Sequence, residues 1–462
     1  MKVLVNSILA CLILQIGHAQ TTFSEERFYA LVLQNHPLAK QANLEIQFGE
    51  KSVLKARGGF DPKLYNQLNQ KYYEGSQYYS FLNAGLKIPT WYGIEIKSGF
   101  EMNQGAYLSP EEKTPNGGLW YGGVSVSLGQ GMFIDQRRAE LKKAKIFLQS
   151  TYFEQKLQLN ELMYEAGYAY WNWFFAYHSS QVLQDAFTLA SQRFDAVKRM
   201  SYLGDRPDID TLEAIIQVQN REAMFRNFLT DFKGTGYKLA TFLWDENSAP
   251  LELDSLTRPH AIDSISLNAA FILLSEEIDS AIINHPYLSI TNFKIESLKV
   301  DSRLKKEALK PQLNLSYNLI NEPINYNPIT DLSINNYKWG VTFEMPVLLR
   351  KERGDYAMAN LKIQDEQYNL DNNRAYIEFK IRNASVEYQN ALNQVSIYQR
   401  TAEDTYRLLE AERLMFENGE SSLFLINARE TTYIQAKLKL IEVLVKSKQA
   451  LLSLKYALAQ LV

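Results

Sequence analysis

Residues 34–46 read QNHPLAKQANLEI, and residues 283–295 read INHPYLSITNFKI. The triplet Asn-His-Pro at 35–37 therefore recurs at 284–286, within a chain of 462 residues. Proline suits the first turn of a helix, because it lacks the N–H that has no partner there, and it pushes the preceding residue out of the helical conformation. We expect each triplet to mark the start of a helix.

Two further pairs of segments match in the same order along the chain. GVSVSLGQGMFIDQRRAELKKAKI at 123–146 resembles GVTFEMPVLLRKERGDYAMANLKI at 340–363, and residues 209–214 align with 423–428. Three blocks that occur twice in one order predict an internal duplication, with a period far longer than that of solenoid repeats.

The N-terminus is typical of a secretory signal peptide. Lys2 precedes a largely apolar run that ends at Gly17-His18-Ala19, which supplies the small residues of a cleavage site. The apolar run continues past Cys11, so we expect no lipid anchor there. The predicted organisation of the chain is as follows: signal peptide 1–19; first structural repeat 20–245, with an opening helix, strands at about 63–130, a long helix at about 135–203 and a return helix at about 208–244; connector 246–268; second structural repeat 269–462, with an opening helix, strands at about 312–346, a long helix at about 355–417 and a return helix at about 421–462.

Composition excludes several classes of function. Cys11 is the only cysteine, so the mature chain can form neither a disulfide nor a thiolate metal site. With 49 basic and 52 acidic residues, nothing favours nucleic acid as a partner. His36 and His285 have no second ligand at metal spacing, and no nucleophile–base pair or phosphate loop appears. The aromatic run YAYWNWFFAYH at 168–178 is interpreted as packing. We therefore predict no enzyme, cofactor or metal.

Two stretches of the second half alternate with a period of two. LNLSYNLI at 313–320 and KWGVTFEM at 338–345 each place apolar side chains on one face and polar ones on the other. No mature segment approaches the ~20 apolar residues of a membrane-spanning helix, whereas amphipathic strands of ~9–11 residues can cross a bilayer in a closed sheet. Four aromatic residues are candidates for the membrane interface: Trp120, Tyr121, Tyr337 and Trp339.

Strand number and helix length both point to an oligomer. The first half could supply four strands, at about 63–74, 78–88, 92–104 and 119–130, and the second half two. The smallest outer-membrane barrels have about eight strands, so several chains would share one barrel. A helix of roughly 65 residues is about 98 Å long, and one return helix plus one opening helix would match that length.

These residues resemble the TolC-like outer-membrane factor family. The resemblance rests on the duplicated Asn-His-Pro triplets, on the Gly-Val-Ser/Thr strands at 123–125 and 340–342, and on the glycine turns at Gly204 and Gly419. It implies a homotrimer in which a twelve-stranded membrane β-barrel adjoins an all-α barrel of long helices. Each protomer would then give four strands. The strand-like sequence at 78–104 departs from that pattern and leaves six strands per protomer as the alternative.

The resemblance also implies a function. The chain would be a passive exit duct of an efflux or type I secretion system, in the outer membrane of a Gram-negative bacterium and extending into the periplasm. Its partners would be a periplasmic adaptor (membrane fusion) protein, an inner-membrane transporter and outer-membrane lipid. The alternative is a periplasmic coiled-coil scaffold or adaptor without a pore, and the amphipathic strands favour the duct. The sequence does not name the cargo.

The glycine turns are implied to lie at the periplasmic tip, where the family docks its adaptor. Five acidic residues cluster there: Asp205, Asp208, Asp210, Glu417 and Glu420. In a trimer they would form rings of negative charge, which is a known device for selecting cations. Alternatively, Asp208 and Ser421 cap the return helices and the other acids are simply solvated.

Overall fold

The computed structural model describes residues 22–254, 257–262, 275–322 and 333–462, without the side chains of Ser275 and Glu276. The predicted signal peptide and part of the predicted connector lie outside these residues. The chain forms two compact units, and each draws on both halves of the sequence. We call them the helical unit (up to Asn43, Gln155–Pro286 and Arg374–Val462) and the sheet unit (Leu44–Glu154 and Tyr287–Asn373).

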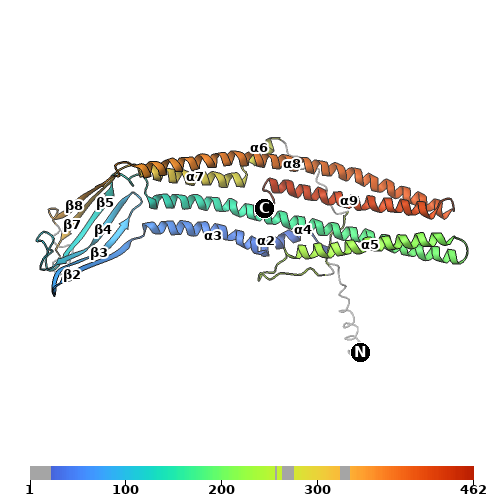
Figure 1. The fold of residues 1–462 in the computed structure, drawn as a ribbon, viewed down its shortest axis with the longest axis horizontal. Coiled ribbons are helices and arrows are strands. Elements are labelled where there is room, and N and C mark those ends of the chain that lie inside the picture. Colours follow the sequence, from blue (N-terminus) through green and yellow to red (C-terminus); the bar gives the residue numbers. More distant parts are fainter. Residues whose placement is uncertain (1–21, 255–256, 263–274, 323–332) are drawn as a thin grey trace, which may run out of the picture. The chain divides into compact units, whose positions relative to one another are not determined.

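The sheet unit contains one antiparallel sheet of six strands in the order β2-β3-β4-β5-β7-β8 (Figure 1). The strands are β2 Lys63–Tyr73, β3 Ser76–Pro89, β4 Ile94–Gln104, β5 Leu119–Ser127, β7 Gln312–Asn321 and β8 Tyr337–Glu344. The first half of the sequence supplies four of them and the second half two. The expectation of four strands per chain is therefore wrong, and the alternative of six is confirmed. The additional pair is β3 and β4, which a short turn joins at Thr90, where the backbone N–H donates to Ile94 O at 2.9 Å.

Two long helices dominate the rest of the chain, as predicted. The eight α-helices in the described residues are α2 Glu25–Asn35, α3 Pro37–Arg57, α4 Gln136–Tyr202, α5 Asp208–Ala240, α6 Ser275–Ile283, α7 Pro286–Glu307, α8 Arg350–Glu417 and α9 Leu423–Ala457. α4 has 67 residues and α8 has 68. Neither contains proline, and both are rich in strong helix formers.

Hydropathy sets the helices apart from membrane-spanning ones. Within the described residues, none is both long enough and apolar enough to cross a membrane.

Each Asn-His-Pro triplet lies between two helices. Pro37 and Pro286 are the first residues of α3 and α7, as expected, but α2 and α6 end just before them, and the sequence pattern missed both. His36 Nδ1 accepts the N–H of Leu38 at 3.2 Å, and its ring also hydrogen-bonds the backbone of Thr241, just after α5. His285 hydrogen-bonds the backbone of Ala457, the last residue of α9. Each histidine therefore ties the start of one helix to the end of another.

An aromatic core fills the helical unit. Tyr170, Trp171, Trp173 and Phe174 of α4 are almost fully buried and pack with Phe23, Phe28 and other apolar residues. The Tyr170 hydroxyl donates to Phe23 O at 2.9 Å, and Trp171 Nε1 donates to Glu25 at 3.2 Å. A two-stranded parallel sheet, formed by β1 Thr22–Phe23 and β6 Arg258–Pro259, lies beside this core. The aromatic run is thus packing, as interpreted, and the polar atoms of Tyr170 and Trp171 have hydrogen-bond partners.

Candidate functional site

The six-stranded sheet has one charged face and one uncharged face. Register places directly paired residues on the same face, because successive side chains along a strand alternate. All eight charged residues of the six strands share one face, here named the polar face: Lys63, Lys71, Lys87, Glu95, Lys97, Glu101, Lys338 and Glu344. The opposite face, here named the apolar face, carries mainly Leu, Ile, Val, Phe and Trp. It includes the paired residues Leu315–Val341 and Leu313–Phe343, which the alternation placed on the apolar face of each strand.

The sheet curls toward its polar face. Lys338 Nζ of β8 lies 3.4 Å from the Glu101 carboxylate of β4. The two residues are three strands and four residues apart, a separation of roughly 20 Å in a flat sheet. Side chains of this length can meet over that distance only if the sheet bends and brings them together. The polar face is therefore concave and the apolar face convex.

Two tyrosines form a bridge across the polar face. Tyr65 of β2 and Tyr121 of β5 lie in one register row, and their hydroxyls hydrogen-bond each other. Gly85 and Gly99 lie between them in that row, and a Cβ atom on either glycine would come within 3 Å of a tyrosine hydroxyl. The Tyr121 hydroxyl also donates to Asn83 Oδ1 at 2.8 Å. The glycines thus leave room for both rings to lie across the strands.

Three of the four candidate interface aromatics belong to the apolar face. Trp120, Tyr337 and Trp339 are partly exposed there and lie at the ends of β5 and β8 that are remote from the helices. Tyr121 faces the other way, within the tyrosine bridge, because it follows Trp120 directly in an alternating strand. At the helix-proximal end, Trp91 and Tyr92 are 50% and 83% exposed in the β3–β4 turn. Sequence reasoning missed these two, although an aromatic pair in a strand-connecting turn is a detectable signal.

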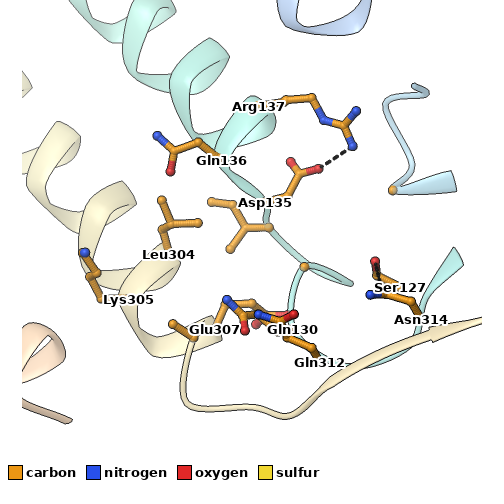
Figure 2. Close-up of a pocket in the computed structure, with 14 residues that line it drawn as sticks. Ser127, Gln130, Asp135, Gln136, Arg137, Leu304, Lys305, Glu307, Gln312 and Asn314 are labelled. Atoms are coloured by element: carbon orange, nitrogen blue, oxygen red, sulfur yellow. Dashed lines mark hydrogen bonds and ion pairs between the residues drawn. The ribbon is translucent and has the colours of Figure 1, made fainter. Parts of the chain in front are cut away.

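A polar cavity of about 440 Å³ lies where the strands meet α4 and α7 (Figure 2). Ser127, Gln312 and Asn314 line it from the strands, and Asp135 and Lys305 line it from the helical side. Ser127 Oγ donates to Asn314 Oδ1 at 2.7 Å. Near the cavity, Glu307 accepts the N–H of Phe133 and pairs with Lys310. Most polar groups in this region thus already have hydrogen-bond or ion-pair partners within the chain. We therefore interpret the cavity as packing space between the strands and the helices rather than as a binding site.

Asp135 anchors the start of α4. Its carboxylate accepts the backbone N–H of Arg138 at 2.9 Å and the Arg138 Nε at 3.1 Å, and it pairs with Arg137 at 3.4 Å. Burial alone would raise the pKa of this carboxyl, but the hydrogen bonds and charge of Arg138 lower the pKa below its usual value. The two arginines are therefore committed to a helix cap rather than presented to a ligand.

The turns at Gly204 and Gly419 have the same geometry. Both glycines have φ near +80°, at +83° and +77°. The next residue in each turn, Asp205 or Glu420, donates its N–H to the carbonyl five residues earlier, at 2.9 and 2.8 Å. This is the Schellman ending of a helix, which needs a left-handed residue that only glycine adopts without strain. The two predicted tip turns are thus equivalent structures in the two halves of the sequence.

The tip acids differ in their surroundings. Asp205, Glu417 and Glu420 are exposed, whereas Asp210 pairs with Arg206 at 3.2 Å. Asp208 accepts a hydrogen bond from Ser201 at 2.6 Å. The interpretation of Asp208 and Ser421 as helix caps is wrong. Pro207 precedes α5 as its cap residue without a side-chain bond, and Ser422 accepts the N–H of Leu425 at the start of α9.

A buried ion cluster lies between α4, α5, α8 and α9. Glu430 is only 2% exposed and accepts two hydrogen bonds from Arg193, at 2.9 and 3.0 Å, and one from Arg221 at 2.9 Å. Arg413 lies 3.7 Å from the same carboxylate. Burial lowers the pKa of Arg221 from its usual value, and Glu430 opposes that shift. Sequence reasoning missed this cluster, because its members are distributed over four helices without a motif.

No metal site appears among the residues that the structure describes: no three His, Cys, Asp or Glu side chains gather there as ligands could. His36 and His285 are engaged at the helix junctions instead.

The fold combines an open, curled, amphipathic sheet with two helices of 67 and 68 residues. No family model and no curated protein matches the chain. Solved structures do match it. The open state of the MtrE outer membrane channel of Neisseria gonorrhoeae has a TM-score of 0.69 and 12% identity, covering 94% of this chain and 88% of that one.

Two other structures agree at similar levels. The VceC outer membrane protein of Vibrio cholerae matches with a TM-score of 0.65 and 11% identity, over 94% of this chain and 95% of that one. The CmeC outer membrane channel of Campylobacter jejuni matches with a TM-score of 0.63 and 12% identity, over 94% and 85%. At such identities the likeness concerns the fold. The chain therefore has the TolC-like fold that the sequence resembles.

Proposed function

We propose that this chain is one subunit of a homotrimeric outer-membrane channel, the passive exit duct of a tripartite efflux or type I secretion system. Its sheet would lie in the outer membrane of a Gram-negative bacterium, and its helices would extend into the periplasm. A periplasmic adaptor and an inner-membrane transporter would deliver the cargo. No residue is assigned a catalytic role, because conduction needs a lined passage rather than chemistry.

The observation that carries this proposal is the complete segregation of charge between the two faces of the sheet. All eight charged strand residues occupy the concave face, and the convex face carries none. A strand in lipid must keep charged groups off its outer face. Each Lys or Arg that faced lipid at the bilayer centre would destabilise the barrel by about 2–4 kcal/mol. A water-filled lumen inside and lipid outside account for both faces.

The two edges of the sheet favour assembly of several chains. β2 and β8 are the edge strands, so each has one side without a strand partner in this sheet. Unpaired backbone groups are too costly to leave facing lipid, so the edges have to pair. Three sheets joined β8 to β2 would make an eighteen-stranded barrel. The likeness to the outer membrane channels MtrE and CmeC supports a closed, conducting barrel.

The proposal also assigns a role to each remaining candidate site. The exposed turns at Gly204 and Gly419 would contact the adaptor, and Asp205, Asp208, Asp210, Glu417 and Glu420 would surround the aperture. Trp120, Tyr337 and Trp339 would lie at the outer membrane interface. We also propose that the chain is an internal duplication, which the repeated order of two helices, strands, long helix and return helix supports. Three chains would then place six related units around the pore.

Membrane fractionation followed by planar-bilayer recording tests the proposal. We expect the protein in the outer-membrane fraction and discrete conductance steps from the purified protein. Two adjacent positions of β5 sharpen the test. Val124 lies 41% exposed on the apolar face, and Ser125 lies on the polar face. Val124→Lys should reduce assembly into membranes severely, whereas Ser125→Lys should assemble normally.

The competing function is a periplasmic scaffold without a pore. It would predict recovery of the wild-type chain from the soluble periplasm and equal tolerance of lysine at Val124 and Ser125. Either result would contradict the channel.

A further inference from the structure

Four lysines lie in one register row across the polar face. Lys63 of β2 pairs with Lys87 of β3, and Lys87 pairs with Lys97 of β4. The row continues through Gly123 and Asn318 to Lys338 of β8. It therefore crosses all six strands and begins and ends with lysine at the two edges of the sheet. We call these four lysines the basic row.

Like charges directly opposite each other on neighbouring strands are destabilising. The pairs Lys63–Lys87 and Lys87–Lys97 place three ammonium groups side by side without an acid between them. Folding alone gives no reason for this arrangement, since polar uncharged residues would suit a wet surface equally well. The cost indicates that the row serves a ligand or a permeating solute.

Carboxylates compensate only part of the row. Lys97 pairs with Glu95 at 3.4 Å, and Lys338 pairs with Glu101 at 3.4 Å. Among the described residues, Lys63 and Lys87 have no carboxylate within ion-pair distance, and Lys87 Nζ instead lies 5.1 Å from the centre of the Tyr65 ring. Over all six strands, five lysines face three glutamates. The polar face keeps an excess of positive charge, concentrated at β2 and β3.

The tyrosine bridge holds part of the row in place. Tyr65, which carries Lys87 over its ring, is itself fixed by its hydrogen bond to Tyr121 across the two glycines. A cation over an aromatic face keeps its charge and remains available to an anion on its other side. Lys87 is therefore a positioned positive charge on a concave wall rather than a freely moving one.

We propose that the basic row is an anion-selecting element of the lumen, which binds and passes solutes that carry carboxylate or phosphate groups. This inference rests on the proposed function, because it needs the polar face to line a conducting passage. In a trimer each lysine of the row recurs three times at its own height, with Lys63 and Lys87 toward the helix-proximal end of the strands and Lys338 toward the remote end. Rings of lysine or arginine favour anions in pores. The acidic residues at the Gly204 and Gly419 turns lie on other elements, so a substitution in the row leaves their charges unchanged.

Reversal potentials in a tenfold KCl gradient test the inference on the purified full-length protein. The variant Lys63→Gln/Lys87→Gln removes the two lysines that lack a carboxylate partner, and Lys63→Arg/Lys87→Arg keeps their charge. We expect the glutamine variant to lower the chloride-to-potassium permeability ratio about threefold or more, and the arginine variant to retain the wild-type ratio. Open channels with the same ratio in the glutamine variant and the wild type would overturn the inference. A wild-type protein that forms no channels would instead overturn the proposed function, and the inference with it.

A cysteine at position 63, in the edge strand β2, allows charge to be added after the channel has folded. The only native cysteine is Cys11, within the predicted signal peptide, so Lys63→Cys should be the one reactive site of the mature chain. Within one open channel, a positively charged methanethiosulfonate reagent should restore the anion preference, and a negatively charged one should shift the ratio toward potassium. Equal effects of the two reagents would overturn the inference.

Discussion

The helical unit buries its large aromatic side chains, whereas the sheet unit leaves several of them exposed. In the helical unit, Trp171 and Trp173 are each 2% exposed, inside a core that the unit supplies itself. In the sheet unit, Trp339 is 62% exposed and Phe343 is 66% exposed, both on the apolar face. The same kinds of residue are thus core in one unit and surface in the other.

This difference indicates what each unit needs in order to be stable. A dry aromatic core stabilises the helical unit without help from its surroundings. The apolar face of the sheet leaves its large side chains without a core inside the chain, and exposed apolar patches of this kind mark interaction surfaces. Stability of the helical unit should therefore respond to substitutions in its own core, and stability of the sheet to its environment.

One tryptophan from each unit provides the largest expected effect. Trp173→Ala should destabilise the helical unit by about 3–5 kcal/mol, because it removes a buried side chain that stacks on Phe232 and contacts Tyr170. Trp339→Ala should change the unfolding free energy in detergent by less than about 1 kcal/mol. Urea unfolding followed by far-UV circular dichroism measures both. Equal losses in the two variants would remove the contrast between the units.

Periodicity predicted the sheet better than it predicted the ion cluster. The alternation at 313–320 and 338–345 assigns each side chain to a face, and register confirms the assignment. By contrast, the members of the Glu430 cluster come from four helices, and no spacing along the chain links them. Tyr121 shows the limit at closer range. Alternation predicts that Tyr121 faces away from Trp120, onto the polar face. It does not predict the hydrogen bond to Tyr65, which lies three strands away.

The helix junctions show a different limit. The proline rule located the first residues of α3 and α7, because it depends only on local conformation. The helices before each triplet, α2 and α6, are 11 and 9 residues long. Helices that short gain most of their stability from tertiary packing, so local sequence offers a weak signal for them.

His285 provides an intermediate effect, which depends on pH. Its pKa is lowered to about 4, chiefly by burial; the hydrogen bond to Ala457 opposes the shift, and the nearby Lys156 and Lys380 contribute to it. Between about pH 6.5 and pH 4 the unfolded chain therefore binds a proton that the folded chain does not. Stability should fall as the pH falls through this range, by roughly 2–3 kcal/mol at pH 4.5 relative to pH 7.5.

The comparison of wild type with His285→Gln isolates that contribution, since other titrating groups are common to both proteins. Urea unfolding at pH 7.5, 6.0 and 4.5 should show a smaller loss in the variant than in the wild type. A variant that loses as much stability as the wild type would show that this histidine does not titrate between the two states. The result sharpens the contrast between the units, because it measures how dry the interior of the helical unit is.

Two glycines of the helical unit give the smallest effect, with opposite signs. Gly204 has φ of +83° at the end of α4, so Gly204→Ala should destabilise the protein by about 1 kcal/mol through backbone strain. Gly234 lies within α5, and a Cβ atom there would meet nothing within 4 Å. Gly234→Ala should therefore stabilise by about 0.5–1 kcal/mol, through higher helix propensity. Urea unfolding measures both shifts, and a loss of stability in both variants would mean that contacts with another chain, rather than the local conformation, fix the glycine at 234.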